Sequence, residues 1–168
     1  MTDDGAGAPR LLELFPDTVT AGERLRASHR TVAVAESCTG GLLGAVLSAV
    51  PGSSAYLLGG VIAYADAVKR AELDVPAEVL AAHGAVSAEV AGAMARGVRS
   101  RLGADVGVAI TGVAGPGGES PSKPAGLVFV AIADGAGERV TRLDGDRGRE
   151  GNRASAVRAA LQLLLQAP

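Results

Sequence analysis

The sequence predicts an α/β fold in which helices cover a mostly parallel sheet that has an antiparallel strand near its end. Two observations lead to this prediction. Short apolar segments of strand length alternate along the chain with helical segments, which is the order typical of α/β proteins with parallel sheets. The last two strand segments are joined through Asp134-Gly135, a dipeptide typical of hairpin turns between antiparallel strands.

Five segments are predicted to be strands. Residues 31–35, with the sequence TVAVA, form a short apolar run bounded by polar residues, as expected of a buried strand. The run at 106–110 has the same character and predicts a second buried strand. The complete set of predicted strands is 31–35, 59–64, 106–110, 126–133 and 138–143.

Helices are predicted between these strands and at both ends of the chain. Pro51-Gly52 ends the helix that follows the first strand, because neither residue suits a helix interior. Ser87 is a suitable N-cap for a later helix, and Glu89 lies favourably in its first turn. The predicted helices cover about 18–28, 42–50, 66–73, 76–83, 88–102 and 151–166.

Length and composition predict one compact domain. The chain has 168 residues, of which 48% are hydrophobic, so it can bury a core. Two Phe, two Tyr and no Trp leave that core to Val, Leu, Ile and Ala. With no internal repeat or linker visible, we predict an N-terminal extension over residues 1–17 and a single domain over 18–168.

Charge and cysteine content narrow the function classes. The formal net charge is −2, and the Arg-rich stretch 139–158 also carries acidic residues, so no nucleic-acid partner is expected. No apolar run reaches the ~20 residues of a membrane span. The acidic start at Asp3 and Asp4 does not resemble a signal peptide, and the single cysteine, Cys38, excludes an internal disulfide. We therefore expect a cytoplasmic protein with no membrane partner.

The first polar loop, Glu36-Ser37-Cys38-Thr39-Gly40-Gly41, lies between a predicted strand and a predicted helix. Ligands of open α/β sheets gather at such strand ends, and free amides at a helix start can bind a phosphate or an oxyanion. The loop is neither a Walker loop nor a nucleophile elbow. The simpler alternative is an ordinary turn in which Ser37 or Thr39 caps the helix.

The second polar loop begins with Thr111-Gly112-Val113-Ala114-Gly115-Pro116-Gly117-Gly118, directly after a predicted strand. Its glycines allow the backbone to wrap closely around a small ligand. The alternative is a flexible surface loop without a role in binding. The polar residues at the other strand ends favour a binding site.

Lysine is rare in this sequence. The chain has 14 Arg and two Lys, Lys69 and Lys123. A lysine can lose its proton when buried and act as a base, whereas arginine stays charged. Lys69 follows Tyr64 by about one helical turn and is placed to take a proton from Ser37, although a solvated helix residue is the plain alternative. Neither His29 nor His83 has a catalytic setting, and a nucleophilic Cys38 is a further alternative.

Four segments resemble the CinA C-terminal domain, the nicotinamide mononucleotide deamidase family. They are Ala35-Glu36-Ser37-Cys38-Thr39-Gly40-Gly41-Leu42, Gly59-Gly60-Val61-Ile62-Ala63-Tyr64, His83-Gly84-Ala85-Val86-Ser87 and Ala109-Ile110-Thr111-Gly112-Val113-Ala114-Gly115-Pro116-Gly117-Gly118. The similarity covers roughly residues 18–166. It implies a three-layer α/β/α sandwich with a mixed, mostly parallel five-stranded sheet, in the stand-alone form of the domain.

The resemblance also implies an activity and a set of residues. The activity is hydrolysis of nicotinamide mononucleotide to nicotinate mononucleotide and ammonia in pyridine nucleotide recycling. The residues matching Ser37 and Lys69 are its nucleophile and basic partner, and Tyr64 and Thr111 complete the catalytic group. The sequence departs from the family at Ala65-Asp66, where the family usually has Ser or Thr and then Asn.

The combined hypothesis is a serine amidohydrolase without metal or other cofactor, acting on a small nucleotide and expected to assemble as a homo-oligomer, most simply a dimer. Amides around Thr39 to Gly41 would stabilise the oxyanion. The glycine-rich loop and an arginine near the last helix would hold the ribose phosphate. Gly145-Asp146-Arg147 matches the family's Gly-Asp-Arg by residue type, but spacing to the final helix favours Arg149 with Arg153. The residues assigned to substrate binding are Thr39, Gly40, Gly41, Gly112, Gly115, Gly117, Arg147 and Arg149. The alternatives are a non-catalytic nucleotide-binding domain acting through a partner and an amidase for another small amide.

Overall fold

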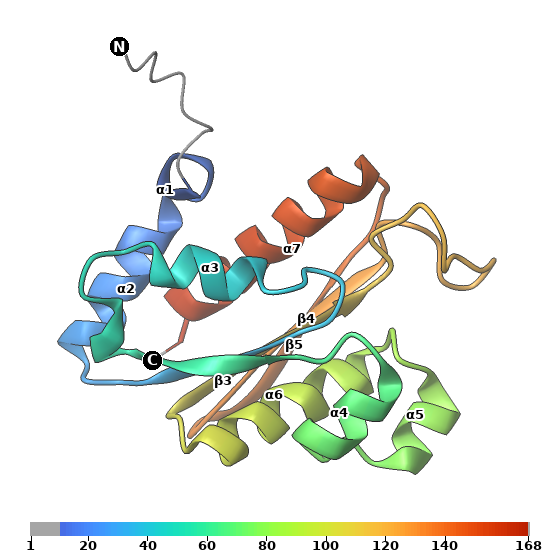
Figure 1. Cartoon of the computed structure of the whole chain (residues 1–168), viewed down its shortest axis with the longest axis horizontal. Coiled ribbons are helices and arrows are strands. Elements are labelled where there is room, and N and C mark those ends of the chain that lie inside the picture. Colours follow the sequence, from blue (N-terminus) through green and yellow to red (C-terminus); the bar gives the residue numbers. More distant parts are fainter. Residues whose placement is uncertain (1–10, 168) are drawn as a thin grey trace, which may run out of the picture.

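A computed structural model describes residues 11–167 as one sheet between two layers of helices (Figure 1). The strands are β1 (Val32–Glu36), β2 (Leu57–Ile62), β3 (Val106–Gly112), β4 (Val128–Asp134) and β5 (Gly137–Leu143). The helices are α1 (Leu11–Leu14), α2 (Asp17–Ala27), α3 (Leu42–Ser48), α4 (Asp66–Leu73), α5 (Ala77–His83), α6 (Ala88–Leu102) and α7 (Gly148–Leu165), with a 3₁₀ turn at Ser53–Ala55.

The five strands lie in the order β2-β1-β3-β4-β5. Strand β1 pairs in parallel with both β2 and β3, whereas β4 runs antiparallel to β3 and to β5. The predicted α/β/α sandwich with a mixed five-stranded sheet is confirmed. The expectation of a mostly parallel sheet is slightly off. Of the four pairs of neighbouring strands, two, β3 with β4 and β4 with β5, are antiparallel.

The two faces of the sheet carry side chains of different size. Successive residues of a strand point to opposite faces, and β1 and β3 alternate between branched and very small residues. Val32, Val34, Val108 and Ile110 pack on the side of α2, α3 and α7. Ala33, Ala35, Ala109 and Ala131 pack on the side of α6. The sequence therefore predetermines a thick core on one face and a thin, tightly packed one on the other.

Glycines allow helix α6 to lie close to its neighbours. A Cβ on Gly107 of β3 would lie 2.1 Å from the backbone oxygen of Ala95 in α6. A Cβ on Gly97 of α6 would lie 2.0 Å from the backbone oxygen of Leu73 at the end of α4. Neither position has space for a side chain. Helix α4, which carries Lys69, is therefore held close against α6, the helix that packs on this face of the sheet.

The predicted elements all exist, with bounds shifted by a few residues. The largest strand shift is in β2, which covers Leu57–Ile62 where 59–64 is predicted. The final helix begins at Gly148, three residues before the predicted start at 151. The predicted division at residue 17 stays a prediction, and residues 1–10 of that extension, including Asp3 and Asp4, lie outside the described part. No helix within residues 11–167 is long and apolar enough to cross a membrane.

Candidate active site

A cavity of about 230 Å³ opens where the carboxyl ends of β1, β2 and β3 meet. The chain leaves β1 toward α3 on one face of the sheet and leaves β2 toward α4 on the other face. Divergence of this kind creates the crevice in which α/β proteins bind ligands. The lining side chains with polar groups are Ser37, Cys38, Tyr64, Asp66, Lys69, Thr111 and Arg149.

Ser37 is the first residue after β1 and lies in a tight turn. Its backbone amide donates to the backbone oxygen of Ile110 at 2.9 Å, and its backbone oxygen accepts from the Gly40 amide at 3.0 Å. The positive φ of Gly40 and of Gly41, +60° and +96°, completes the turn, a conformation that glycine adopts without strain. Among residues 11–167 no partner accepts or donates a hydrogen bond at the Ser37 hydroxyl, so this group lies uncommitted at the cavity.

The neighbouring residue, Glu36, points to the opposite face and is fully committed. Its buried carboxylate accepts from the amides of Gly41 at 3.1 Å, Leu43 at 3.0 Å and Gly44 at 2.8 Å. These are the amides that the start of a helix leaves without partners. The predicted oxyanion amides at Gly40 and Gly41 are therefore already occupied, one by Ser37 and one by Glu36. Sequence reasoning missed Glu36, although an acidic residue ending an apolar strand is a usable signal.

Lys69 is almost completely buried, with 1% of its side chain exposed. Its Nζ donates to the Tyr64 backbone oxygen at 3.2 Å and to Asp66 Oδ1 at 3.3 Å. It lines the same cavity as Ser37 but makes no hydrogen bond to it. The structure thus brings the predicted nucleophile and base to one cavity, with the amine held by Asp66.

Two other predicted residues, Thr111 and Arg149, form hydrogen bonds that connect separate segments of the chain. The Thr111 hydroxyl donates to the Ala85 oxygen at 2.7 Å, which ties the end of β3 to the loop before α6. The Arg149 guanidinium donates to the Gly115 oxygen at 3.1 Å and to the Tyr64 hydroxyl at 3.2 Å. Arg149 therefore spans from α7 to both the glycine-rich loop and the β2–α4 connection at the cavity rim.

Asn152 of α7 fixes the base of the glycine-rich loop. Its buried side-chain amide donates to the Ala114 oxygen at 3.0 Å and to Asp146 Oδ1 at 2.8 Å, and its oxygen accepts from the Arg147 amide. Hydrogen bonds from Asn152 and from the Gly148 amide hold the pKa of Asp146 below its usual range. Sequence reasoning did not identify Asn152. A polar residue on the apolar side of a helix is the signal that could have found it.

Cys38 borders the cavity, and its thiol is buried. Burial is the main cause that raises its pKa to about 11, and the Glu36 carboxylate acts in the same direction. A thiol with such a pKa is protonated at neutral pH and is a poor nucleophile. The Ser37 hydroxyl next to it has the better position for nucleophilic chemistry.

Comparison with known proteins now gives the family. The family model for the CinA C-terminal domain matches residues 17–167. The chain belongs to the CinA C-terminal domain family. It is 54% identical over 144 residues to a CinA-like protein of Synechococcus sp. strain RCC307, covering 84% of this chain and 34% of that protein. A putative competence-damage inducible protein of Moorella thermoacetica is 52% identical over 144 residues, covering 85% and 34%.

Solved structures agree with this assignment. A CinA superfamily protein from Klebsiella pneumoniae matches with a TM-score of 0.87 at 36% identity, covering 91% of this chain and 96% of that one. The competence/damage inducible protein CihA from Agrobacterium tumefaciens matches with a TM-score of 0.84 at 39% identity, covering 89% and 94%. The chain spans about a third of the length of the curated relatives it matches.

Several predicted binding residues of this CinA C-terminal domain lie away from the cavity. Gly112, Gly115 and Gly117 line it, but Thr39, Gly40 and Gly41 do not. The Arg147 guanidinium folds back onto the oxygens of Asp144 and Gly145. Arg153, the arginine that the spacing pairs with Arg149, does not line the cavity and donates to the Thr39 oxygen at 3.0 Å. Of the two predicted arginines, Arg149 is the one at the cavity.

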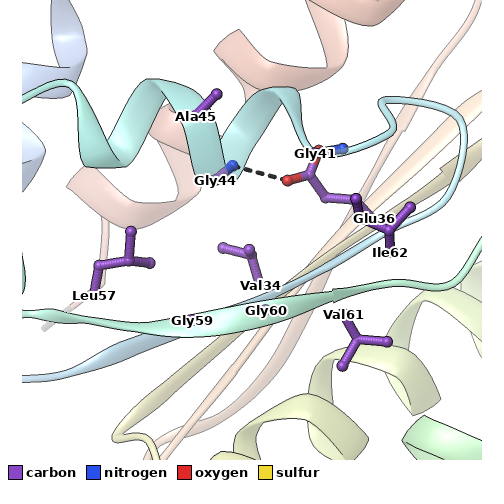
Figure 2. A pocket seen from close by; sticks show the side chains of 10 residues that line it. All are labelled: Val34, Glu36, Gly41, Gly44, Ala45, Leu57, Gly59, Gly60, Val61 and Ile62. Atoms are coloured by element: carbon purple, nitrogen blue, oxygen red, sulfur yellow. Dashed lines mark hydrogen bonds between the residues drawn. The ribbon is translucent and has the colours of Figure 1, made fainter.

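A second hollow, a groove of about 260 Å³, lies on the other side of β1 (Figure 2). It runs between α3 and the edge strand β2 and is lined mainly by apolar and glycine residues, among them Val34, Gly60 and Ile62. Its acidic group, Glu36, points at the start of α3, as the dashed line to Gly44 shows. The groove is slightly larger than the cavity at Ser37, but far fewer of its lining side chains carry polar groups.

Within residues 11–167 no three His, Cys, Asp or Glu side chains gather in a group that could hold a metal ion. The groups at the cavity are instead an uncommitted hydroxyl, a buried amine, a carboxylate and a guanidinium. A hydroxyl and an amine at one strand-end cavity are the groups required for nucleophilic attack on an acyl carbon.

Proposed function

We propose that this CinA-family domain is a serine amidohydrolase that converts nicotinamide mononucleotide to nicotinate mononucleotide and ammonia. One observation supports the proposal above all others. The uncommitted Ser37 hydroxyl and the buried Lys69 amine line one cavity at the end of β1 and β2. Ser–Lys pairs are a known arrangement for acyl transfer. We place the reaction in the cytoplasm.

The first half of the reaction forms an acyl-enzyme. Lys69 moves its amine from Asp66 to Ser37 and accepts the hydroxyl proton as Ser37 Oγ attacks the carboxamide carbon. The protonated amine then gives that proton to the departing nitrogen, and ammonia leaves as the carbon–nitrogen bond breaks. In the second half, Lys69 takes a proton from water, which attacks the ester carbon and releases the carboxylate, and Ser37 regains its proton.

The oxyanion is assigned to the amides of Cys38 and Thr39, of which Thr39 lies in the range expected from the sequence and Cys38 lines the cavity. Gly40, Gly41, Leu43 and Gly44 donate within the turn and to Glu36. Cys38 and Thr39 are the two central residues of the turn. Within residues 11–167, their backbone amides donate no hydrogen bond to another residue. These two donors are adjacent to the nucleophile and are proposed to stabilise the developing charge.

The ribose phosphate is assigned to Arg149 and the glycine-rich loop. Two nitrogens of the Arg149 guanidinium donate to the Gly115 oxygen and the Tyr64 hydroxyl, and these two contacts orient it. A planar guanidinium suits phosphate oxygens. Gly115, Gly117 and Gly118 line the same cavity, and of these Gly117 and Gly118 are exposed.

An ammonia assay on the purified chain with nicotinamide mononucleotide tests the proposal, with nicotinate mononucleotide measured by chromatography. We expect both products in equal amounts, and none from the Ser37→Ala variant. Thermal stabilisation by the nucleotide without ammonia would favour a non-catalytic nucleotide-binding domain. Faster hydrolysis of amides that lack a 5′-phosphate would favour an amidase for another small amide.

A further inference from the structure

We infer that Asp66 recognises the positive charge of the substrate's ring and so selects cationic over neutral carboxamides. The inference rests on the proposed function, because the nicotinamide ring of the nucleotide is a pyridinium cation. Asp66 is the first residue of α4 and lines the cavity, with 59% of its side chain exposed. Its Oδ1 lies 3.3 Å from the Nζ of the buried Lys69.

The charges around the cavity make Asp66 distinctive. The turn after β1 contributes Cys38, whose raised pKa keeps it neutral, and the β2–α4 connection contributes Tyr64 and Asp66. Helix α7 contributes the Arg149 cation, and the loop before α6 contributes only Ala85 and Val86. Among the described residues that line this cavity, Asp66 is therefore the single carboxylate, facing one lysine and one arginine.

This balance has a consequence when a cationic ring enters. A pyridinium next to a protonated Lys69 would meet two cations and one carboxylate, which is unfavourable at short range. If Asp66 pairs with the ring instead, Lys69 loses its counter-ion and gains a nearby cation. The Lys69 amine is then released from Asp66 and can turn to the Ser37 hydroxyl, which is the movement that the proposed reaction requires. A neutral ring provides neither effect.

The half-exposed position of Asp66 sets the size of the effect. A carboxylate open to water at the cavity mouth interacts less strongly with a cation than a buried one. We therefore expect the contribution of Asp66 to lie at the lower end of the range for charged hydrogen bonds, about tenfold in affinity. Its place in the first turn of α4 also favours an acidic residue through the helix dipole. That structural role does not depend on the charge of the ligand, so the two roles can be separated.

The experiment compares two ligands that differ in ring charge. In the Ser37→Ala background, which prevents turnover, calorimetry measures the binding of nicotinamide mononucleotide and of its reduced dihydro form, whose ring is uncharged. Asp66→Asn should weaken binding of the cationic form about tenfold and leave the reduced form within about twofold. Glu72→Gln, a change at another α4 carboxylate, which pairs with Arg101, should alter neither.

Equal weakening for both ligands, or weakening for neither, would overturn the inference. Thermal melting checks that Asp66→Asn is folded. Absence of turnover by the unaltered chain would defeat the proposed function, whereas the two-ligand binding result would still decide the charge recognition.

Discussion

The two sides of the end of β1 differ in how far their polar groups are satisfied. On the α3 side, the Glu36 carboxylate has three amide donors and the groove beside it is otherwise apolar. On the α4 side, the Ser37 hydroxyl has no partner among residues 11–167, and Lys69 is held by a half-exposed carboxylate. Of these two adjacent residues, Glu36 thus stabilises the turn, whereas Ser37 is available for chemistry. The chemistry of the lining side chains, more than the volume of a hollow, identifies the candidate site.

The largest expected effect comes from removing the base on the α4 side. Lys69→Arg keeps the charge but cannot accept a proton at neutral pH, and Lys69→Met removes the charge, so each should lower kcat about 10²- to 10⁴-fold. Initial rates of ammonia release measure the loss. The matched control is Lys123→Arg, because Lys123 donates to the His83 oxygen and lies outside the cavity lining. Near-normal rates in both Lys69 variants would contradict the general-base assignment.

The fold was largely predictable because local signals determine it. The alternation of Val and Ala in residues 31–35 and 106–110 specifies buried strands, and Asp134-Gly135 specifies the hairpin that the structure contains. The start of β2 was less clear: Gly59 and Gly60 interrupt the apolar run, and Leu57 and Leu58, before them, are not separated from the preceding turn by any strong signal.

The site was less predictable because contacts between distant segments determine it. The sequence indicated which segments carry polar groups, but not that Glu36 would occupy the Gly41 amide, one of those proposed for the oxyanion. The choice between Arg147 and Arg149 depends on the helical phase of the start of α7, which begins three residues earlier than predicted. The spacing of Asp66 and Lys69 in the predicted helix 66–73 already places a carboxylate near the amine, but the burial of Lys69, with 1% of its side chain exposed, could not be read from residue types alone.

The second effect tests the α3 side. Glu36→Gln replaces a charged acceptor by a neutral amide whose NH₂ group faces backbone donors, and it should lower the free energy of unfolding by about 2 kcal/mol. Urea denaturation followed by circular dichroism measures the change. The control is Glu150→Gln at an exposed position of α7, expected to change stability by less than about 0.5 kcal/mol. An unchanged midpoint for Glu36→Gln would show that the carboxylate does not stabilise the turn.

A similar but smaller loss is expected from the packing that positions Lys69. Gly97→Ala would normally stabilise a helix, but its Cβ would lie 2.0 Å from the Leu73 oxygen, so α4 must move. We expect a net loss of about 1 kcal/mol in the free energy of unfolding together with a lower kcat. Gly135→Ala provides the control, because no atom lies within 4 Å of the place that its added Cβ would take. Full activity in Gly97→Ala would mean that the position of α4 against α6 is unimportant for the chemistry.

The smallest effect should come from the thiol that lies beside Ser37. With a pKa of about 11, only about one Cys38 side chain in a thousand is a thiolate at pH 8, so iodoacetamide should react far more slowly with the folded chain than with the urea-denatured one. The rate should increase as the pH rises toward 11, because the thiolate fraction grows. Cys38→Ser should retain kcat within about twofold, since a buried thiol of this pKa has no part in the proposed reaction. Rapid alkylation at pH 7 that abolishes ammonia release, together with an inactive Cys38→Ser, would show that the nucleophile is Cys38 and not Ser37.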